Sequence, residues 1–222
     1  EEYMGSRWGS SICDHYTYVI VGDGCLMEGI SQEAISLAGK LKLKKLIVIW
    51  DDNEITIDGK VGLSCSTDQI ARFKSSEWST FSCDAHNPIE IDQAITRAKK
   101  DSRPSLIAAK SIIGYGSTAK QGTSGAHGAP LGKNEVEQIR KNFDWQYKEF
   151  EIPSDIKESW LKIGQKNHKV FKDWSDRLQS LSEKKRTTFL NELDIIFPAK
   201  LTLGIKNFKK LYSQELQTEL AT

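Results

Sequence analysis

The sequence of 222 residues carries 31 Lys and Arg against 30 Asp and Glu, so its charge gives no basis for binding nucleic acid or an anionic membrane. With 38% hydrophobic residues the chain is long enough to bury a core, and no apolar run approaches the ~20 residues that span a bilayer. No signal peptide opens the sequence, and its 4 cysteines lack CxxC or zinc spacing, which favours a reduced, cytoplasmic protein. Because the first residue is Glu1 rather than Met, we expect a piece of a longer polypeptide.

The first quarter of the chain predicts two strands with a helix between them. Residues 1–15 are rich in Gly and Ser and are predicted to be irregular. Residues 17–21 and 45–50 are short, β-branched apolar runs, which are typical of buried parallel strands. Residues 30–41 between them have the spacing of an amphipathic helix. Its predicted buried face consists of Ile30, Ala34, Leu37, Ala38 and Leu41.

Strands and helices continue to alternate further along the chain. The predicted order is a turn at 55–59, a helix at 68–73, a weak strand at 78–82, a helix at 87–100 and a clear strand at 105–113. Strands that alternate with helices at this spacing predict an α/β fold with a doubly wound, mostly parallel sheet.

The last half of the chain contains a long loop and a helical region. Residues 114–130 are rich in Gly and Ser; loops of this length are often lids or binding loops, although a flexible insertion gives the same pattern. Residues 154–182 carry an amphipathic helical stripe, with Ser154 as the predicted N-cap. We therefore predict an α/β domain over residues 1–150 and a helical connector, lying on a partner surface, over residues 151–222.

The turn Gly22-Asp23-Gly24 lies where the first predicted strand ends. Ligands of α/β sheets bind beyond the carboxyl ends of the strands, and glycines there let backbone N–H groups approach a phosphate. A helix starting behind the turn would add a positive dipole end. The Asp23 carboxylate would repel a bare phosphate, so a cation between the two groups is expected.

Two kinds of site have a glycine-rich turn at the end of a strand. A dinucleotide-binding fold needs G-x-G-x-x-G and an acidic residue about 20 residues on. That pattern fits poorly, because the third glycine is displaced to Gly29. A metal site fits better, because Asp23 and Asn53 end successive strands and can converge at one edge of the sheet. Carboxylate, amide and backbone carbonyl oxygens suit an octahedral Mg²⁺ that takes its other ligands from a diphosphate and water.

Longer motifs resemble the transketolase family. The Gly-Asp-Gly turn with Asn53 downstream matches the motif of thiamine diphosphate enzymes. Blocks similar to transketolases in particular cover residues 14–18, 22–31, 36–39, 52–59, 113–117 and 126–132. The resemblance implies the diphosphate domain of the thiamine diphosphate-binding fold, incomplete at its N-terminus, with a connector leading toward a pyrimidine domain outside this chain.

The resemblance implies a role for each matched residue. The metal, Mg²⁺ with Ca²⁺ or Mn²⁺ as substitutes, would be bound by the side chains of Asp23 and Asn53 and the carbonyl oxygen of Ile55. Thiamine diphosphate would contact Gly22, Gly24, Asn53, Ile57, Ile113 and His127. For Ile57 and Ile113 the alternative is an ordinary position in the core. Glu54 stands where the family often has Gly, and we expect little harm because Ile55 acts through its backbone.

Three residues would belong to the catalytic machinery. His127 would contact both the diphosphate and the sugar donor. Glu28 and Glu33 would link two cofactor sites near a subunit interface; the alternative is a solvated pair, because residues five apart do not share a helix face.

The implied activity is the transfer of a two-carbon ketol unit from a ketose phosphate to an aldose phosphate, in the pentose phosphate pathway, by a homodimer. Because the family site forms between two subunits and needs residues outside this chain, we expect the isolated chain to be inactive. The alternatives are another thiamine diphosphate enzyme of the dihydroxyacetone synthase or deoxyxylulose-phosphate synthase type, a non-catalytic cofactor-binding subunit, and a nicotinamide dehydrogenase.

Overall fold

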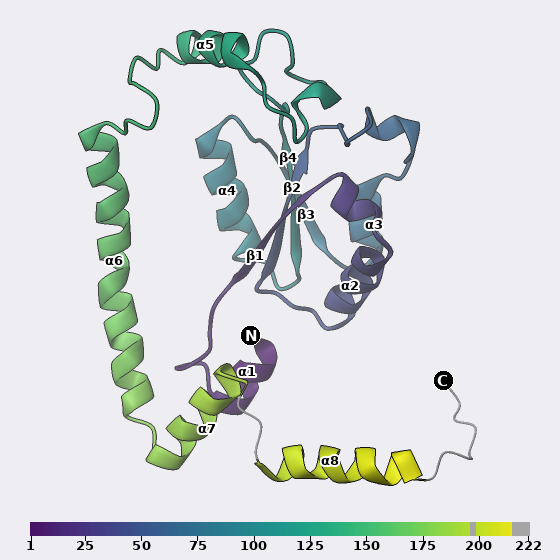
Figure 1. Cartoon of the computed structure of the whole chain (residues 1–222), viewed down its shortest axis with the longest axis vertical. Coiled ribbons are helices and arrows are strands. Elements are labelled where there is room, and N and C mark those ends of the chain that lie inside the picture. Colours follow the sequence, from purple (N-terminus) through teal and green to yellow (C-terminus); the bar gives the residue numbers. More distant parts are fainter. Residues whose placement is uncertain (196–198, 215–222) are drawn as a thin grey trace.

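The computed structural model describes residues 1–195 and 199–214, and a four-stranded sheet forms its centre (Figure 1). The strands are β1 (Thr17–Gly22), β2 (Leu46–Asp52), β3 (Ser79–Asp84) and β4 (Ser105–Lys110). They lie in the order β1-β2-β4-β3, and every neighbouring pair is parallel. The predicted α/β fold with a parallel sheet is confirmed.

Helices cover both faces of this sheet. The helices of the described chain are α1 (Glu2–Trp8), α2 (Gly29–Lys40), α3 (Gln69–Ser75), α4 (Pro88–Ala98), α5 (Lys133–Asn142), α6 (Ser154–Gln179), α7 (Glu183–Leu193) and α8 (Ala199–Gln214). Helices α2 and α3 lie on one face and α4 on the other (Figure 1), so the sheet is doubly wound. None of the described helices is long and apolar enough to cross a bilayer.

Two apolar clusters hold these helices against the sheet. On one face the rings of Phe73 and Trp78 pack edge to face, with centroids 4.9 Å apart, in the same cluster as Leu106. On the other face Ile47 and Ile107 pack against the alanines of α4. Side chains of β2 and β4 reach both clusters, so these central strands are buried on both faces, as their continuous apolar sequences predict.

The predicted buried face of α2 is wrong except at Ala38. Ala38 is buried as predicted, but it is buried together with Ile35 and Gly39. A Cβ on Gly39 would lie 1.7 Å from the carbonyl oxygen of Ser76, so the helix approaches this turn more closely than any other residue would allow. This close approach decides which face of the helix turns inward. The exposed residues of the predicted face are Ile30, Ala34, Leu37 and Leu41.

Other segments also differ from the prediction. Residues 1–15 contain helix α1 rather than only irregular chain. The last strand ends at Lys110 instead of residue 113, which leaves the following residues in a loop. Ser154 is the first residue of α6; Pro153 occupies the N-cap, where it offers no side-chain hydrogen bond. Helix α5 was not predicted, because its sequence is mostly polar.

The N-terminal segment packs against the C-terminal helices. The ring of Trp8 meets Phe189 of α7 edge to face, with centroids 5.5 Å apart. The indole of Trp174 in α6 donates to the carbonyl oxygen of Ile12 over 2.9 Å. These contacts join residues 1–13 to the predicted connector, of which residues 196–198 and 215–222 lie outside the described residues. The division at residue 150 stays a prediction.

Strand β1 lies at the edge of the described sheet and carries the Gly-Asp-Gly turn at its end. Its residues Tyr18, Val19 and Ile20 are 37–78% exposed, so the prediction of a buried strand over residues 17–21 is wrong for the described chain. Gly22 pairs in register with Asp51 of β2. The ends of β1 and β2 therefore meet at one edge of the sheet, as the predicted site requires.

Candidate functional site

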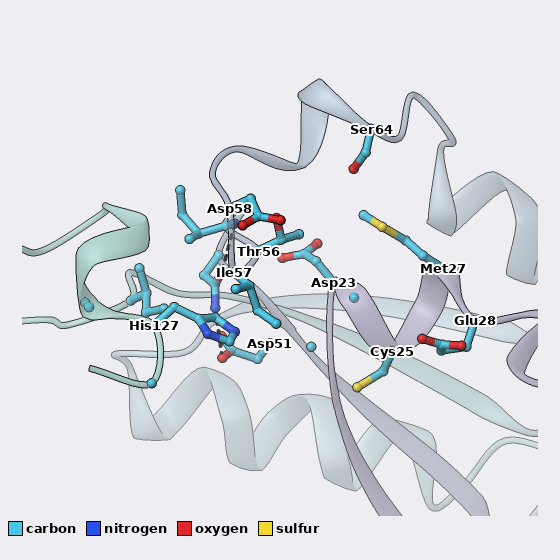
Figure 2. A pocket seen from close by; sticks show the side chains of 17 residues that line it. Asp23, Cys25, Met27, Glu28, Asp51, Thr56, Ile57, Asp58, Ser64 and His127 are labelled. Atoms are coloured by element: carbon cyan, nitrogen blue, oxygen red, sulfur yellow. Dashed lines mark hydrogen bonds between the residues drawn. The ribbon is translucent and has the colours of Figure 1, made fainter. Parts of the chain in front are cut away.

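A cavity of about 720 Å³ opens where β1 and β2 end. Its walls come from the end of β1 with the short 3₁₀ helix η1 (Gly24–Met27), the end of β2 with the turn that follows, Ser64, and the loop after β4. Figure 2 shows side chains converging from these segments. Every predicted site residue except Glu33 lines the cavity: Gly22, Asp23, Gly24, Glu28, Asn53, Ile55, Ile57, Ile113 and His127.

Asp23 is a buried carboxylate, 6% exposed, at the end of β1. Its Oδ1 accepts a hydrogen bond from Nε1 of Trp50 at 3.2 Å, and its Oδ2 accepts one from the backbone N–H of Glu54 at 3.1 Å. Burial raises the pKa of Asp23, the charge of Asp52 raises it further, and these hydrogen bonds oppose both effects. Within residues 1–195 and 199–214, no Lys or Arg forms an ion pair with Asp23. A desolvated carboxylate of this kind is suited to bind a cation.

The turn after β2 supplies further oxygens to the same cavity. Asn53 donates through Nδ2 to Oδ2 of Asp51 at 3.1 Å, and its Oδ1 accepts from the N–H of Ile55 at 2.9 Å. An amide oxygen has two lone pairs, so Oδ1 retains capacity for a metal. In the described part of the chain, no group donates a hydrogen bond to the carbonyl oxygen of Ile55. Both oxygens can therefore accept a further partner.

Glu54 lies between these residues in a left-handed backbone conformation, with φ at 62°. Its Oε1 lies 2.6 Å from Nζ of Lys110, which also lies 3.4 Å from Oδ2 of Asp52. The hydrogen bond from Lys110 lowers the pKa of the Glu54 carboxyl. The ion pair joins the turn after β2 to the end of β4. Neither Glu54 nor Lys110 lines the cavity.

Glycine keeps the backbone bare along one wall of the cavity. A Cβ added to Gly22 or Gly24 would meet no atom within 4 Å, so a side chain there would enter open space rather than clash with the protein. Helix α2 begins at Gly29, close to its predicted start, but η1 lies between it and the Gly-Asp-Gly turn. The backbone near Gly24 thus faces the cavity without the end of α2 directly behind it.

Residues predicted to touch the cofactor or substrate line other parts of the wall. Ile57 is 72% exposed, so an ordinary core position is excluded for it, whereas Ile113 is half-buried. His127 is exposed and, in Figure 2, lies across the cavity from Met27 and Glu28. The cavity therefore combines apolar side chains, an imidazole and the carboxyl groups of Asp23, Glu28, Asp51 and Asp58.

The loop after β4 that carries His127 is held in its first half by contacts with other segments. Near its start, Tyr115 stacks on His86 with ring centroids 3.9 Å apart. Further along, the carboxylate of Glu135 in α5 accepts from the hydroxyl of Ser117 at 2.5 Å and from the N–H of Ala119 at 3.2 Å. These contacts favour the predicted binding loop over a flexible insertion, and they give α5 a clear structural role.

The two glutamates predicted near an interface lie in different environments. Glu28 lines the cavity at the N-cap of α2. Glu33 lies outside the cavity, on an exposed part of α2. One chain by itself contains no subunit interface, so their predicted link between two sites stays a prediction.

Several residues near the site carried no sequence signal of their own. Trp50 donates to the predicted metal ligand Asp23, Lys110 pairs with Glu54 in the turn after β2, and Cys25 and Met27 line the cavity. Within the described ranges, no cluster of three or more His, Cys, Asp or Glu residues could hold a metal ion. Asp23 is the only His, Cys, Asp or Glu residue in the predicted ligand set. The other predicted ligands are an amide oxygen and a backbone carbonyl oxygen. These oxygen donors fit a hard cation.

Comparison with known proteins agrees with this geometry. The family model described as transketolase, thiamine diphosphate binding domain, matches residues 3–197. The transketolase of Rhodobacter capsulatus is 47% identical over 214 residues, which are 96% of this chain and 32% of that protein. Transketolase 1 of Aliivibrio fischeri is 51% identical over 156 residues, which are 70% of this chain and 24% of that protein.

Solved transketolases share the fold. The structure from Leishmania mexicana matches with a TM-score of 0.78 at 34% identity, over 85% of this chain and 29% of its own. A Pichia stipitis transketolase in complex with sedoheptulose-7-phosphate matches with a TM-score of 0.74 at 39% identity, over 81% of this chain and 27% of its own. The chain thus spans about a third or less of the length of these relatives. It belongs to the transketolase family, in which it corresponds to the thiamine diphosphate-binding domain.

Proposed function

We propose that this chain is the diphosphate- and metal-binding part of a transketolase. The complete enzyme would transfer a two-carbon ketol unit from a ketose phosphate to an aldose phosphate, in the pentose phosphate pathway and in the cytoplasm. The observation that carries the proposal is the buried Asp23 carboxylate, which has two hydrogen-bond donors and, within residues 1–195 and 199–214, no ion-pair partner. It lies in a cavity together with Asn53 and Ile55.

The metal would be held by three oxygen donors from two neighbouring strand ends. Asp23 would supply the negative charge, Asn53 its amide oxygen, and Ile55 its carbonyl oxygen. Mg²⁺ suits this set, with Mn²⁺ or Ca²⁺ as substitutes. Because two of the three donors are neutral, the cation would keep enough positive charge to bind a diphosphate.

The cofactor would be thiamine diphosphate, which supplies the carbanion chemistry when bound. Gly22 and Gly24 would let the backbone approach the diphosphate, and the N–H of Gly24 would donate to it. Ile57 and Ile113 would form apolar walls for its rings; the exposure of Ile57 in the cavity supports this role. His127 would donate to the diphosphate and to the sugar donor, in agreement with its exposed place at the cavity wall.

The remaining catalytic groups would come from outside this chain. We infer a pyrimidine domain of the same enzyme and a second subunit in a homodimer, with Glu28 and Glu33 linking the two cofactor sites. The proposal divides the chain into the binding domain over residues 1–150 and a connector over residues 151–222. The exposed Trp160 and Phe171 of α6 support a connector that lies on a partner surface.

The test is ketol transfer by the complete assembly that contains this chain, with Asp23→Ala as the variant. We expect activity that depends on thiamine diphosphate and a divalent cation in the unmodified assembly and is lost on substitution. Lys44→Ala, an exposed lysine outside the cavity lining, is the control and should leave activity unchanged. Full activity of the Asp23 variant would refute the proposed role of this site.

A further inference from the structure

Trp50 lies directly behind the proposed metal ligand. It is the residue of β2 that pairs with Val21 of β1, and it is 8% exposed. Its ring belongs to the apolar cluster that packs α2 and α3 against the sheet. Its Nε1–H nevertheless reaches the edge of the cavity, where it donates to Oδ1 of Asp23 at 3.2 Å.

This hydrogen bond connects two residues that water scarcely reaches. Asp23 is 6% exposed, so its carboxylate depends on protein donors for hydrogen bonding. Trp50 holds Oδ1 while the N–H of Glu54 holds Oδ2 from another direction. With a donor on each oxygen, the plane of the carboxylate has little freedom to rotate. A ligand that is fixed before the cation arrives loses less entropy on binding.

We propose that Trp50 is a positioning residue for the metal, which it serves by orienting the Asp23 carboxylate. The proposal rests on the metal site described under the proposed function and assigns to this site a residue that touches neither metal nor cofactor. Partners that hydrogen-bond to metal ligands commonly change metal affinity when they are removed. The indole does this here from within the apolar core, so one side chain serves both packing and ligand orientation.

Trp78 offers a matched control for the packing role. It is 2% exposed and belongs to the same apolar cluster as Trp50. Its Nε1–H also donates a hydrogen bond, at 2.8 Å, but the acceptor is the backbone carbonyl of Ile35 rather than a proposed metal ligand. Replacement of either tryptophan by Phe removes one indole N–H and leaves a similar gap in the core, whereas only the change at position 50 releases Asp23.

The experiment compares Trp50→Phe with Trp78→Phe in the full chain. Mn²⁺ is titrated in the presence of thiamine diphosphate, and free Mn²⁺ is followed by electron paramagnetic resonance. We expect Trp50→Phe to weaken Mn²⁺ binding by about 10- to 100-fold. Trp78→Phe should stay within about twofold of the unmodified chain, because it is not in contact with the ligands. Equal affinities of the two variants would overturn the proposal.

Loss of stability is separated from loss of orientation by two further measurements. Urea unfolding without metal should give a lower free energy of unfolding for both variants than for the unmodified chain. A loss of stability that both variants share cannot produce a difference between their affinities for Mn²⁺. If Trp50→Phe does not fold, benzothienylalanine at position 50 keeps the bicyclic ring and removes only the N–H; it should show the same weakened Mn²⁺ binding, and unchanged binding would overturn the proposal. Failure of the unmodified chain to bind Mn²⁺ would instead contradict the proposed function.

Discussion

Asp23 joins stability to function at the scale of a single residue. Its carboxylate is buried beside Asp52, and both conditions raise its pKa above that of an unfolded chain. The folded state therefore holds the proton more tightly than the unfolded state does. Because of this, the contribution of Asp23 to stability decreases as pH rises from the unfolded pKa through the raised folded pKa. A bound cation would remove this loss.

The first prediction concerns this pH dependence. Without divalent cations, the free energy of unfolding of the unmodified chain minus that of Asp23→Asn should decrease as pH rises from about 4, the range of an unfolded Asp, toward neutrality. Urea unfolding monitored by circular dichroism at several pH values measures this difference. Addition of Mg²⁺ with thiamine diphosphate should reduce the pH dependence of the free energy of unfolding in the unmodified chain and leave that of Asp23→Asn unchanged. A difference that rises with pH without metal would contradict the burial of an unpaired carboxylate.

Gly24 provides a second prediction at the residue scale. A Cβ at Gly24 meets no protein atom within 4 Å and Gly24 lines the cavity, so Gly24→Ala should leave the free energy of unfolding within about 0.5 kcal/mol. The same methyl group should weaken binding of thiamine diphosphate in the presence of Mg²⁺, measured by calorimetry. Gly62→Ala is the control, because a Cβ there also meets nothing within 4 Å and Gly62 is outside the cavity lining. Equal cofactor affinity of both variants would show that the diphosphate does not approach Gly24.

Helix α5 and the loop after β4 act together at the scale of elements. Glu135, in the first turn of α5, accepts hydrogen bonds from Ser117 and Ala119 in this loop. Both bonds lower the pKa of the Glu135 carboxyl, which stays ionised at neutral pH. His127 lies further along the same loop, so α5 restrains the segment that presents the imidazole to the cavity.

This arrangement predicts the effect of removing the restraint. In Glu135→Ala, amide hydrogen exchange over residues 111–132 should become faster, while exchange in β2 and β4 stays unchanged. Glu137→Ala is the control, because this exposed glutamate of the same helix makes no described hydrogen bond to the loop. Mass spectrometry of exchanged peptides provides the measurement. Unchanged exchange in the loop of Glu135→Ala would mean that α5 does not hold it.

The elements that could be predicted from the sequence are those whose packing depends on strong local patterns. β2 and β4 are continuous apolar runs, and Asn87-Pro88 begins α4 with a side-chain cap on Ile89. The buried face of α2 could not be predicted from periodicity, because the contact of Gly39 with a distant turn decides its orientation. Likewise α5 contains few apolar residues, and its stability depends on contacts with the loop.

The site was predictable to a similar extent. Asp23 and Asn53 could be paired because the carboxyl ends of adjacent parallel strands meet at one edge of a sheet. Trp50 and Lys110 could not be assigned, because their roles depend on which way a strand side chain points and on the left-handed turn at Glu54. A local sequence pattern predicts strands and the ends at which they meet. The hydrogen bonds of Trp50 and Lys110 join side chains to residues that are distant in the sequence.

At the scale of the whole molecule, much apolar surface lies open in the described chain. Ile20 on β1, Ile30 on α2 and Phe171 on α6 are each more than half exposed. The chain also covers about a third or less of its relatives' length. Exposed apolar patches of this extent usually mark contact surfaces. We therefore expect the complete enzyme, rather than this chain, to be the active unit.

Activity of the isolated chain tests that expectation. With thiamine diphosphate, Mg²⁺, a ketose phosphate donor and an aldose phosphate acceptor, the 222-residue chain should show no ketol transfer in a coupled assay. A complete transketolase measured under the same conditions is the positive control. Turnover by the isolated chain would contradict the proposal that catalytic groups come from a pyrimidine domain and a second subunit.

The most direct measurement for the proposed site is calorimetric titration of the full chain with thiamine diphosphate, with and without Mg²⁺, alongside Asp23→Ala. Binding should require Mg²⁺ and should weaken in the variant by at least the roughly 10- to 100-fold that is typical of partners of metal ligands. Binding that persists without a divalent cation, or that is equally tight in Asp23→Ala, would contradict a metal-bridged diphosphate at the end of β1.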